Sequence, residues 1–163
     1  MNGSKLKRLA LAALAAVATG PAALGDDVPF AQAPPSSPEA GSVVSLADVM
    51  AGAQLRHIKL WQAIRAKNWG LVAFEAALMQ DSLGAAAMLY RNIPIDYVTA
   101  AAKQLGALKD AAKAGDATKM EAIFTNLTAA CNACHQAAGV GFIRMETPGL
   151  SPFSNQNFAP ERN

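Results

Sequence analysis

Residues 117–138 read ATKMEAIFTNLTAACNACHQAA, and their spacing is the clearest structural signal in the chain. Apolar residues recur at steps of four, three, four, three and four: Met120, Phe124, Leu127, Cys131, Cys134 and Ala138. Such spacing places side chains on one face of an α-helix. Gly139 and Gly141 follow directly and end the pattern. The stretch therefore predicts an amphipathic helix that buries one face.

A similar pattern begins at Ser45, where Ser45 and Asp48 form a start resembling a capping box. The same alternating steps give a helical seam up to about Lys67: Leu46, Met50, Ala53, His57, Leu60 and Ile64. This segment predicts a first helix that carries a histidine on its inner face.

Two more helices are predicted between these segments. Asn68 is a helix cap for residues 69–90, whose inner side is predicted to be Leu71, Phe74, Leu78, Ala85 and Leu89. Pro94 prevents direct continuation into a third helix over 96–114. The predicted seam of this third helix is Val98, Ala101, Leu105, Leu108 and Ala112. Gly115 and Asp116 then suit a helix end and the cap of the next helix.

Composition agrees with an all-α fold. The 163 residues are 52% hydrophobic, and alanine is abundant while aromatic residues make up only 6%, which argues against β-sandwiches and barrels. Helices of about 20 residues joined by short loops pack as antiparallel neighbours. We therefore predict one domain over residues 45–163, an antiparallel up-down-up-down four-helix bundle with an irregular C-terminal tail at about 139–163.

The N-terminal segment reads as a secretory signal peptide. Residues 1–8 hold three basic side chains, residues 9–18 are apolar, and residues 23–25 read Ala-Leu-Gly, a small-residue cleavage site. A membrane anchor is the alternative, but Gly20-Pro21 makes the apolar run short for a span of about 20 residues. We expect residues 1–25 to be cleaved and the mature protein to be periplasmic, with no membrane span.

Residues 26–44 contain four prolines together with serine and glycine, a composition typical of a flexible linker. Removal of residues 1–25 takes away three basic residues and leaves 11 basic against 12 acidic. Such a nearly neutral chain lacks the electrostatic footprint of a nucleic-acid-binding protein, so nucleic acid is not an expected partner.

The chemistry of the chain centres on Cys131-Asn132-Ala133-Cys134-His135, a C-x-x-C-H motif. In an exported chain this motif is typical of c-type haem attachment. Each thiol would form a thioether with one vinyl group, and the imidazole of His135 would bind the iron as proximal ligand. Cys131, Cys134 and His135 lie at i, i+3 and i+4, so they share one helix face. We predict one covalently attached haem c in the bundle core.

The same residues also allow three other kinds of site. A zinc site could combine Cys131, Cys134 and His135 with His57, and a disulfide between the two cysteines would leave His135 unexplained. A thioredoxin-like redox motif needs a βαβ context, which the sequence does not show.

Four helices with C-x-x-C-H near the end of the last one resemble the cytochrome c-prime superfamily. Four pieces resemble, more narrowly, a group of small exported bacterial c-type cytochromes: LRHIKLW at 55–61, NW at 68–69, CNACH at 131–135 and PFSNQ at 152–156. The likeness spans about residues 45–160. The segment after the motif is longer than in typical cytochrome c-prime proteins.

The residue on the other side of the iron would decide the function. The resemblance implies that it comes from the first helix, which favours His57 as sixth ligand trans to His135. Met50 on the same seam is the alternative, Met145 in the tail is another, and a five-coordinate iron remains open. Arg56 is a candidate contact for a haem propionate, because a buried carboxylate needs a cationic partner.

These observations predict a periplasmic monohaem c-type cytochrome that carries single electrons between redox partner proteins. No second constellation suits enzymatic work, so the chain is not expected to be an enzyme. A gas-binding haem protein for nitric oxide or carbon monoxide is one alternative, and a non-haem exported bundle with zinc or a disulfide is another. The resemblance also implies a homodimer through the first two helices. Phe142, Phe153 and Phe158 in the tail are expected to cover a haem edge.

Overall fold

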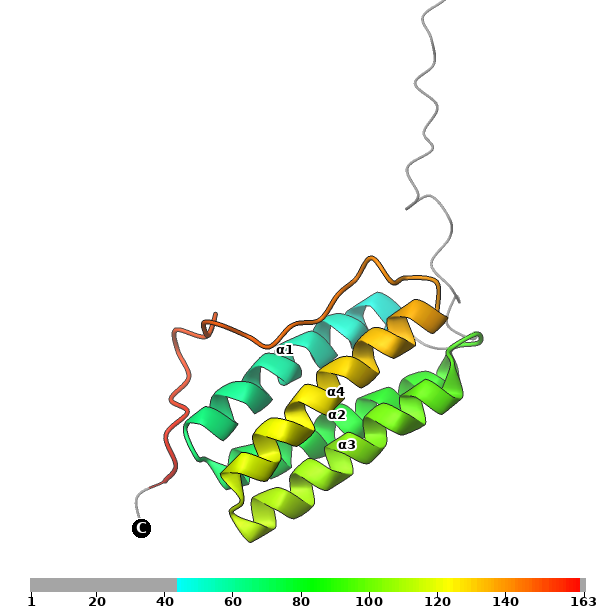
Figure 1. The fold of residues 1–163 in the computed structure, drawn as a ribbon. Helices are drawn as coiled ribbons and strands as arrows, with labels where there is room; N and C mark the ends of the chain where they lie inside the picture. Colours follow the sequence, from blue (N-terminus) through cyan, green and yellow to red (C-terminus); the bar gives the residue numbers. More distant parts are fainter. Residues whose placement is uncertain (1–43, 162–163) are drawn as a thin grey trace, which may run out of the picture. The chain divides into compact units, whose positions relative to one another are not determined.

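The computed structural model describes residues 44–161, which form four helices and no strand. The helices are α1 (Leu46–Arg65), α2 (Trp69–Leu89), α3 (Ile95–Ala114) and α4 (Ala117–Ala137) (Figure 1). Each boundary lies within about two residues of its predicted position. The predicted signal peptide (1–25) and almost all of the predicted linker (26–44) lie outside the described residues.

Side-chain caps begin three of the helices. Ser45 and Asp48 form the predicted capping box: the Ser45 hydroxyl accepts from the Asp48 amide at 3.1 Å, and the Asp48 carboxylate accepts from the Ser45 amide at 3.2 Å. Hydrogen bonds from Ser45 lower the pKa of Asp48. Asn68 accepts from the Leu71 amide at 3.0 Å to cap α2, and Asp116 caps α4 in the same way. The three predicted caps are therefore confirmed.

Helices α1, α3 and α4 end in the same geometry. A residue with positive φ follows each helix: Gly115 (69°) directly after α3, and Lys67 (58°) and Gly139 (75°) two positions after α1 and α4. The amide of the following residue then reaches back to a carbonyl five positions earlier: Asn68 to Ala63, Asp116 to Ala111 and Val140 to His135. This is the Schellman motif, which satisfies carbonyls that a helix end leaves free.

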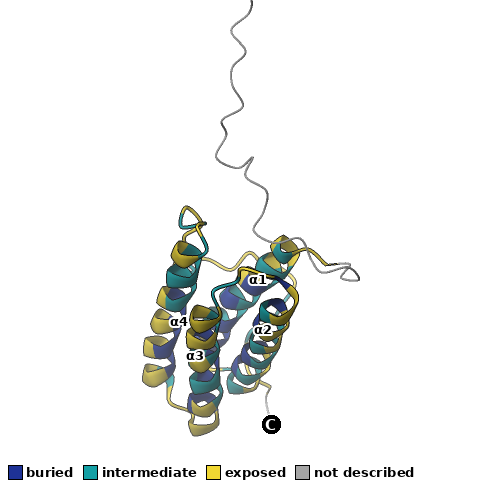
Figure 2. Ribbon diagram, turned by 90° about the vertical axis from the view of Figure 1, so that its right-hand side faces the viewer, coloured by how far each residue is buried: buried dark blue, intermediate teal, exposed yellow. Residues whose placement is uncertain are grey.

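One hydrophobic core lies among the four helices, and Figure 2 shows their buried residues facing inward. Its largest fully buried side chains include Phe124, Leu60, Leu105 and Leu108. The predicted inner seams of α1, α3 and α4 supply most of this core, although their members at the motif end, such as Met50 and Val98, are only partly buried.

The predicted inner face of α2 was only partly right. Leu71 packs against the core and Leu78 is partly buried, but the other three predicted residues are exposed. Phe74 is 58% exposed and Leu89 is 43% exposed, and Ala85 is also exposed. The helix instead buries Val72, Glu75, Ala76, Met79, Leu83 and Ala86. Because α2 is apolar on nearly all sides, the pattern of hydrophobic residues could not select a face. Its one well-buried charge, Glu75, was the informative residue.

Contacts between α1 and α4 follow a simple register. His57 lies against Thr128, Trp61 against Phe124, and Arg65 against Glu121. Residue numbers thus rise along α1 as they fall along α4. The beginning of α1 consequently lies at the same end of the bundle as the last turns of α4, which carry the C-x-x-C-H motif (Figure 1).

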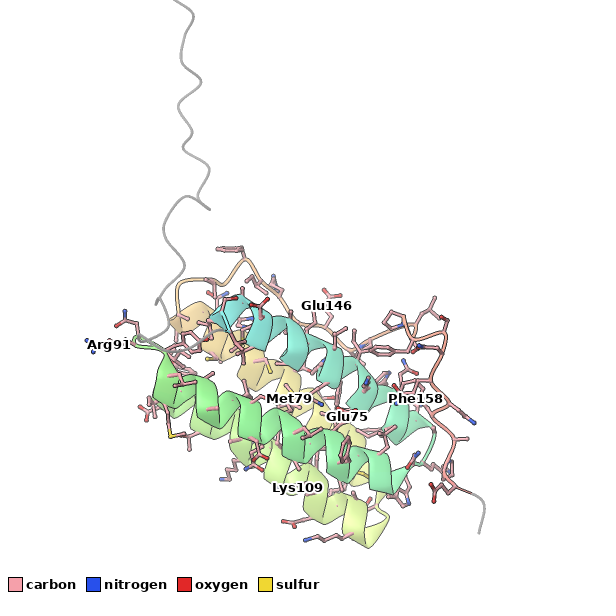
Figure 3. The ribbon with its side chains drawn as sticks, turned by 180° about the vertical axis from the view of Figure 1, so that it is seen from behind. Glu75, Met79, Arg91, Lys109, Glu146 and Phe158 are labelled. Atoms are coloured by element: carbon pink, nitrogen blue, oxygen red, sulfur yellow. The ribbon has the colours of Figure 1, made fainter. Side chains whose placement is uncertain are left out.

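The segment after α4 returns along α1 toward the α1–α2 turn (Figure 1). Lys59 on α1 lies over the Phe153 ring, 5.2 Å from its centroid, and Phe153 stands 6.2 Å from Phe158. Asn68 donates to the carbonyls of Phe158 and Ala159 at 3.3 and 3.2 Å. Phe158 therefore lies at the far end of α1 from the motif (Figure 3), which does not fit its expected place over a haem edge.

None of the four helices has both the length and the apolar character needed to cross a membrane.

Candidate functional site

The three motif residues lie together in the last two turns of α4. Cys131, Cys134 and His135 are each half-buried, and both cysteines are free thiols. Burial raises the pKa of Cys131 to about 11, and the neighbouring Cys134 adds to the rise. Burial also raises the pKa of Cys134. Both groups are therefore uncharged thiols at neutral pH.

His135 is oriented by the segment that follows its helix. Its Nδ1 lies 2.8 Å from the carbonyl oxygen of Ile143. Because a carbonyl only accepts, Nδ1 carries the hydrogen and donates it. In the neutral ring Nε2 then bears a lone pair. A histidine that ligates a metal through one nitrogen usually donates from the other in this way.

His57 is fully inside the core, with 1% of its surface exposed. Its Nε2 lies 2.8 Å from the Thr128 hydroxyl, which itself donates to the Phe124 carbonyl at 3.0 Å. The hydroxyl hydrogen is thus already used, so Nε2 of His57 must donate. Its Nδ1 is buried and has no hydrogen-bond partner among the described residues.

Burial keeps His57 neutral, since it lowers the pKa of the imidazole to about 4. The ring also packs on Phe124, with centroids 4.4 Å apart. The predicted sixth ligand is thus held by Thr128 in this structure, about two turns before His135 on α4.

Met50 lies nearer to the level of the motif than His57 does. In the α1–α4 register His57 is level with Thr128, and seven residues toward the start of α1 correspond to seven toward the end of α4. This brings Met50 level with His135. Met50 is half-buried and packs against the core. Met145, the third candidate, is held through its backbone by Asn132.

Arg56 faces α2 and pairs with Glu75. Its guanidinium lies 2.8 Å from the Glu75 carboxylate, and Lys59 lies 3.7 Å from the other oxygen. Glu75 is only 3% exposed and lies between α1 and α2 (Figure 3). Arg56, the predicted contact for a haem propionate, is thus paired with Glu75 in this structure. The sequence signal for this pair was a single glutamate within the apolar run of residues 69–80.

The residues present fit a covalently bound haem. The donor set is complete: two free thiols and an imidazole whose Nδ1 hydrogen is occupied. Partly buried apolar side chains from three helices pack against the core at this end, namely Met50, Val98, Ala130 and Cys131. A flat apolar ring could lie against such a surface.

The zinc alternative finds less support. Within residues 44–161, no three His, Cys, Asp or Glu side chains are grouped so that they could hold a metal ion. His57 in particular faces Thr128 instead of the two cysteines.

The described part of the chain has two surface hollows. One, of about 550 Å³, lies between the start of α2 and the end of the tail, around Asn68, Phe74 and Pro160. The other, of about 380 Å³, lies between α1 and α2 around Gly52 and Tyr90. Neither is lined by Cys131, Cys134 or His135, so neither marks the motif.

Comparison with known proteins adds no identification. No protein family matches the chain, and no curated protein or solved structure is significantly similar to it.

Proposed function

We propose that this chain is a monohaem c-type cytochrome, exported to the periplasm, that carries single electrons between redox partner proteins. Its haem would lie in the core of an antiparallel up-down-up-down bundle. The observation that supports this most directly is the geometry of the motif. Two free thiols and a histidine share the end of α4, and the histidine donates through Nδ1 to Ile143 at 2.8 Å.

Each residue of the motif would have a separate task. The sulfurs of Cys131 and Cys134 would hold the haem covalently, and Nε2 of His135 would bind its iron. The bound haem supplies one-electron chemistry, and the chain supplies its ligands, its orientation and a medium of low dielectric constant. Close approach of a redox partner to the haem edge would suffice for transfer.

The choice of the sixth ligand is a separate proposal. Met50 is level with His135, whereas His57 donates through Nε2 to Thr128. If Met50 held the iron together with His135, the haem would have a higher reduction potential than with two histidines. We therefore favour Met50 over His57 as the sixth ligand.

A gas-binding haem protein is the second candidate. It is supported by the same hydrogen bond, because an imidazole that donates through Nε2 offers that nitrogen to no iron. If Met50 did not hold the iron either, the haem would be free to bind nitric oxide or carbon monoxide.

The test is expression of the full chain with a haem-maturation system. We expect a mass higher than that of the processed polypeptide by one haem, and haem staining that survives denaturation. A Cys131→Ser, Cys134→Ser variant should lose both signals. A colourless wild-type protein with the mass of the bare chain would overturn the proposal.

Spectra of the ferric protein separate the two haem functions. Low-spin spectra that become high-spin in Met50→Ala but not in His57→Ala support electron transfer with methionine ligation. A wild type that is already high-spin and binds carbon monoxide when reduced supports gas binding.

A further inference from the structure

The segment 139–145 is turned back onto the motif by the end of α4. Gly139, with φ of 75°, lets the Val140 amide reach the His135 carbonyl at 2.9 Å. The Ile143 amide then bonds the Val140 carbonyl at 2.9 Å. These two turns bring the Ile143 carbonyl to His135 Nδ1.

Asn132, the first residue between the two motif cysteines, holds this segment in place. Its side-chain oxygen accepts from the Met145 amide at 2.7 Å, and its side-chain nitrogen donates to the Met145 carbonyl at 2.9 Å. The oxygen and the nitrogen of the Asn132 carboxamide therefore both bind the backbone of Met145, 13 positions away in the chain. Such a two-point contact fixes orientation as well as distance.

We propose that Asn132 is a positioning residue for the proximal histidine. By clamping Met145 it holds Ile143, two residues earlier, with its carbonyl on His135 Nδ1. Asn132 would thus act on the iron through Met145, Ile143 and the imidazole without touching the haem. This inference rests on the proposed function.

The chemical consequence follows from the hydrogen bond to Nδ1. An acceptor on Nδ1 fixes the ring orientation and makes Nε2 a stronger donor to the metal. A stronger donor stabilises the ferric state over the ferrous state, so the hydrogen bond lowers the reduction potential. Loss of the Asn132 clamp should loosen the Ile143 carbonyl and raise the potential.

The clamp can be tested with a substitution that suits the helix. Asn132 lies on a helix, and alanine is a better helix former than asparagine. Cys131, Cys134 and His135 remain intact in Asn132→Ala, so haem attachment should persist. Asn126→Ala is the matched control, because Asn126 is an exposed residue on the same helix.

The first measurement uses the full chain as purified from cells with the haem-maturation system. Asn132→Ala should remove the protection of the Met145 amide against hydrogen exchange, while Asn126→Ala should leave it unchanged. Asn132→Asp keeps an oxygen that accepts from this amide but sets its second oxygen against the Met145 carbonyl. Its protection should therefore fall between those of the wild type and Asn132→Ala. Equal protection in wild type and Asn132→Ala would overturn the clamp.

The second measurement uses the haem-loaded protein. At a fixed solution potential, Asn132→Ala should raise the ratio of reduced to oxidised protein about threefold or more. This corresponds to about 30 mV for a one-electron couple. The Asn126→Ala protein should match the wild type.

The outcomes separate the two proposals. Haem attached to every variant with equal potentials overturns the role of Asn132 and leaves the cytochrome intact. A wild type without covalent haem overturns both.

Discussion

Replacing Thr128 with valine tests whether the buried hydrogen bond of His57 is arranged as described. Valine keeps the β-branched shape and removes only the hydroxyl. That hydroxyl accepts from His57 Nε2 at 2.8 Å and donates to the Phe124 carbonyl at 3.0 Å. Its loss leaves the Nε2 hydrogen without a partner on a side chain that is 1% exposed.

The expected cost follows from that burial. A buried donor left unpaired costs about 1–3 kcal/mol. Because Nδ1 of His57 is also without a partner, a change of tautomer cannot relieve the loss. We expect Thr128→Val to lower the free energy of unfolding of the haem-free protein by about 2 kcal/mol.

Thr125→Val is the matched control for this substitution. Thr125 is exposed on the same helix and donates to the Glu121 carbonyl at 3.1 Å, the same bond that Thr128 makes to Phe124. Urea unfolding should show the loss only in Thr128→Val, with an unchanged slope. The double variant Thr128→Val, His57→Leu should recover part of it, since two apolar partners leave no unpaired donor. Equal stability of the two valine variants would refute the reasoning.

Three further predictions concern charge, backbone and thiol reactivity. Arg56→Leu should lower the free energy of unfolding by about 3 kcal/mol, because it removes the closer of the two cations that neutralise the buried Glu75 carboxylate. Glu75→Gln should cost less, since it leaves no buried charge unpaired; urea unfolding at pH 7 checks this, and the reverse order would contradict it. Lys67→Gly should stabilise the fold by up to about 1 kcal/mol and so raise the melting temperature, since a left-handed conformation costs a non-glycine residue about 1–2 kcal/mol. A lower melting temperature would show that Lys67 is not strained. In haem-free protein at pH 8, iodoacetamide should modify Cys134 before Cys131, because a pKa of about 11 leaves Cys131 almost wholly protonated. The rate of Cys131 modification should rise as the pH approaches 11. Peptide mass spectra that find Cys131 modified first would exclude the described burial.

The helices were predictable because their signals are local. Ser45, Asn68 and Asp116 cap helices in the structure as their residue types and positions indicated, and Gly115 adopts the left-handed conformation expected after a helix. Each signal depends on hydrogen bonds that span only a few residues. The seam of α4 was also readable, since apolar and polar residues alternate at the helical period.

The face of α2 and the surroundings of the candidate site were not predictable. Glu75 became a core residue because Arg56 and Lys59 from another helix neutralise it, and no pattern within α2 indicates that. His57 was recognised as an inner residue, but its partner Thr128 comes from 71 positions away.

The chain's own order of residues determined that four helices form, where they begin and end, and that a C-x-x-C-H motif closes the last one. Those features arise from short-range hydrogen bonding and from helical periodicity. Only the tertiary structure decided that the His57 imidazole is hydrogen-bonded to Thr128 and that Met50 is level with His135. It also decided that Asn132 clamps the returning tail onto the motif. The physical reason is that these contacts depend on the register between helices and on the path of an irregular segment, and both are set by packing between distant residues.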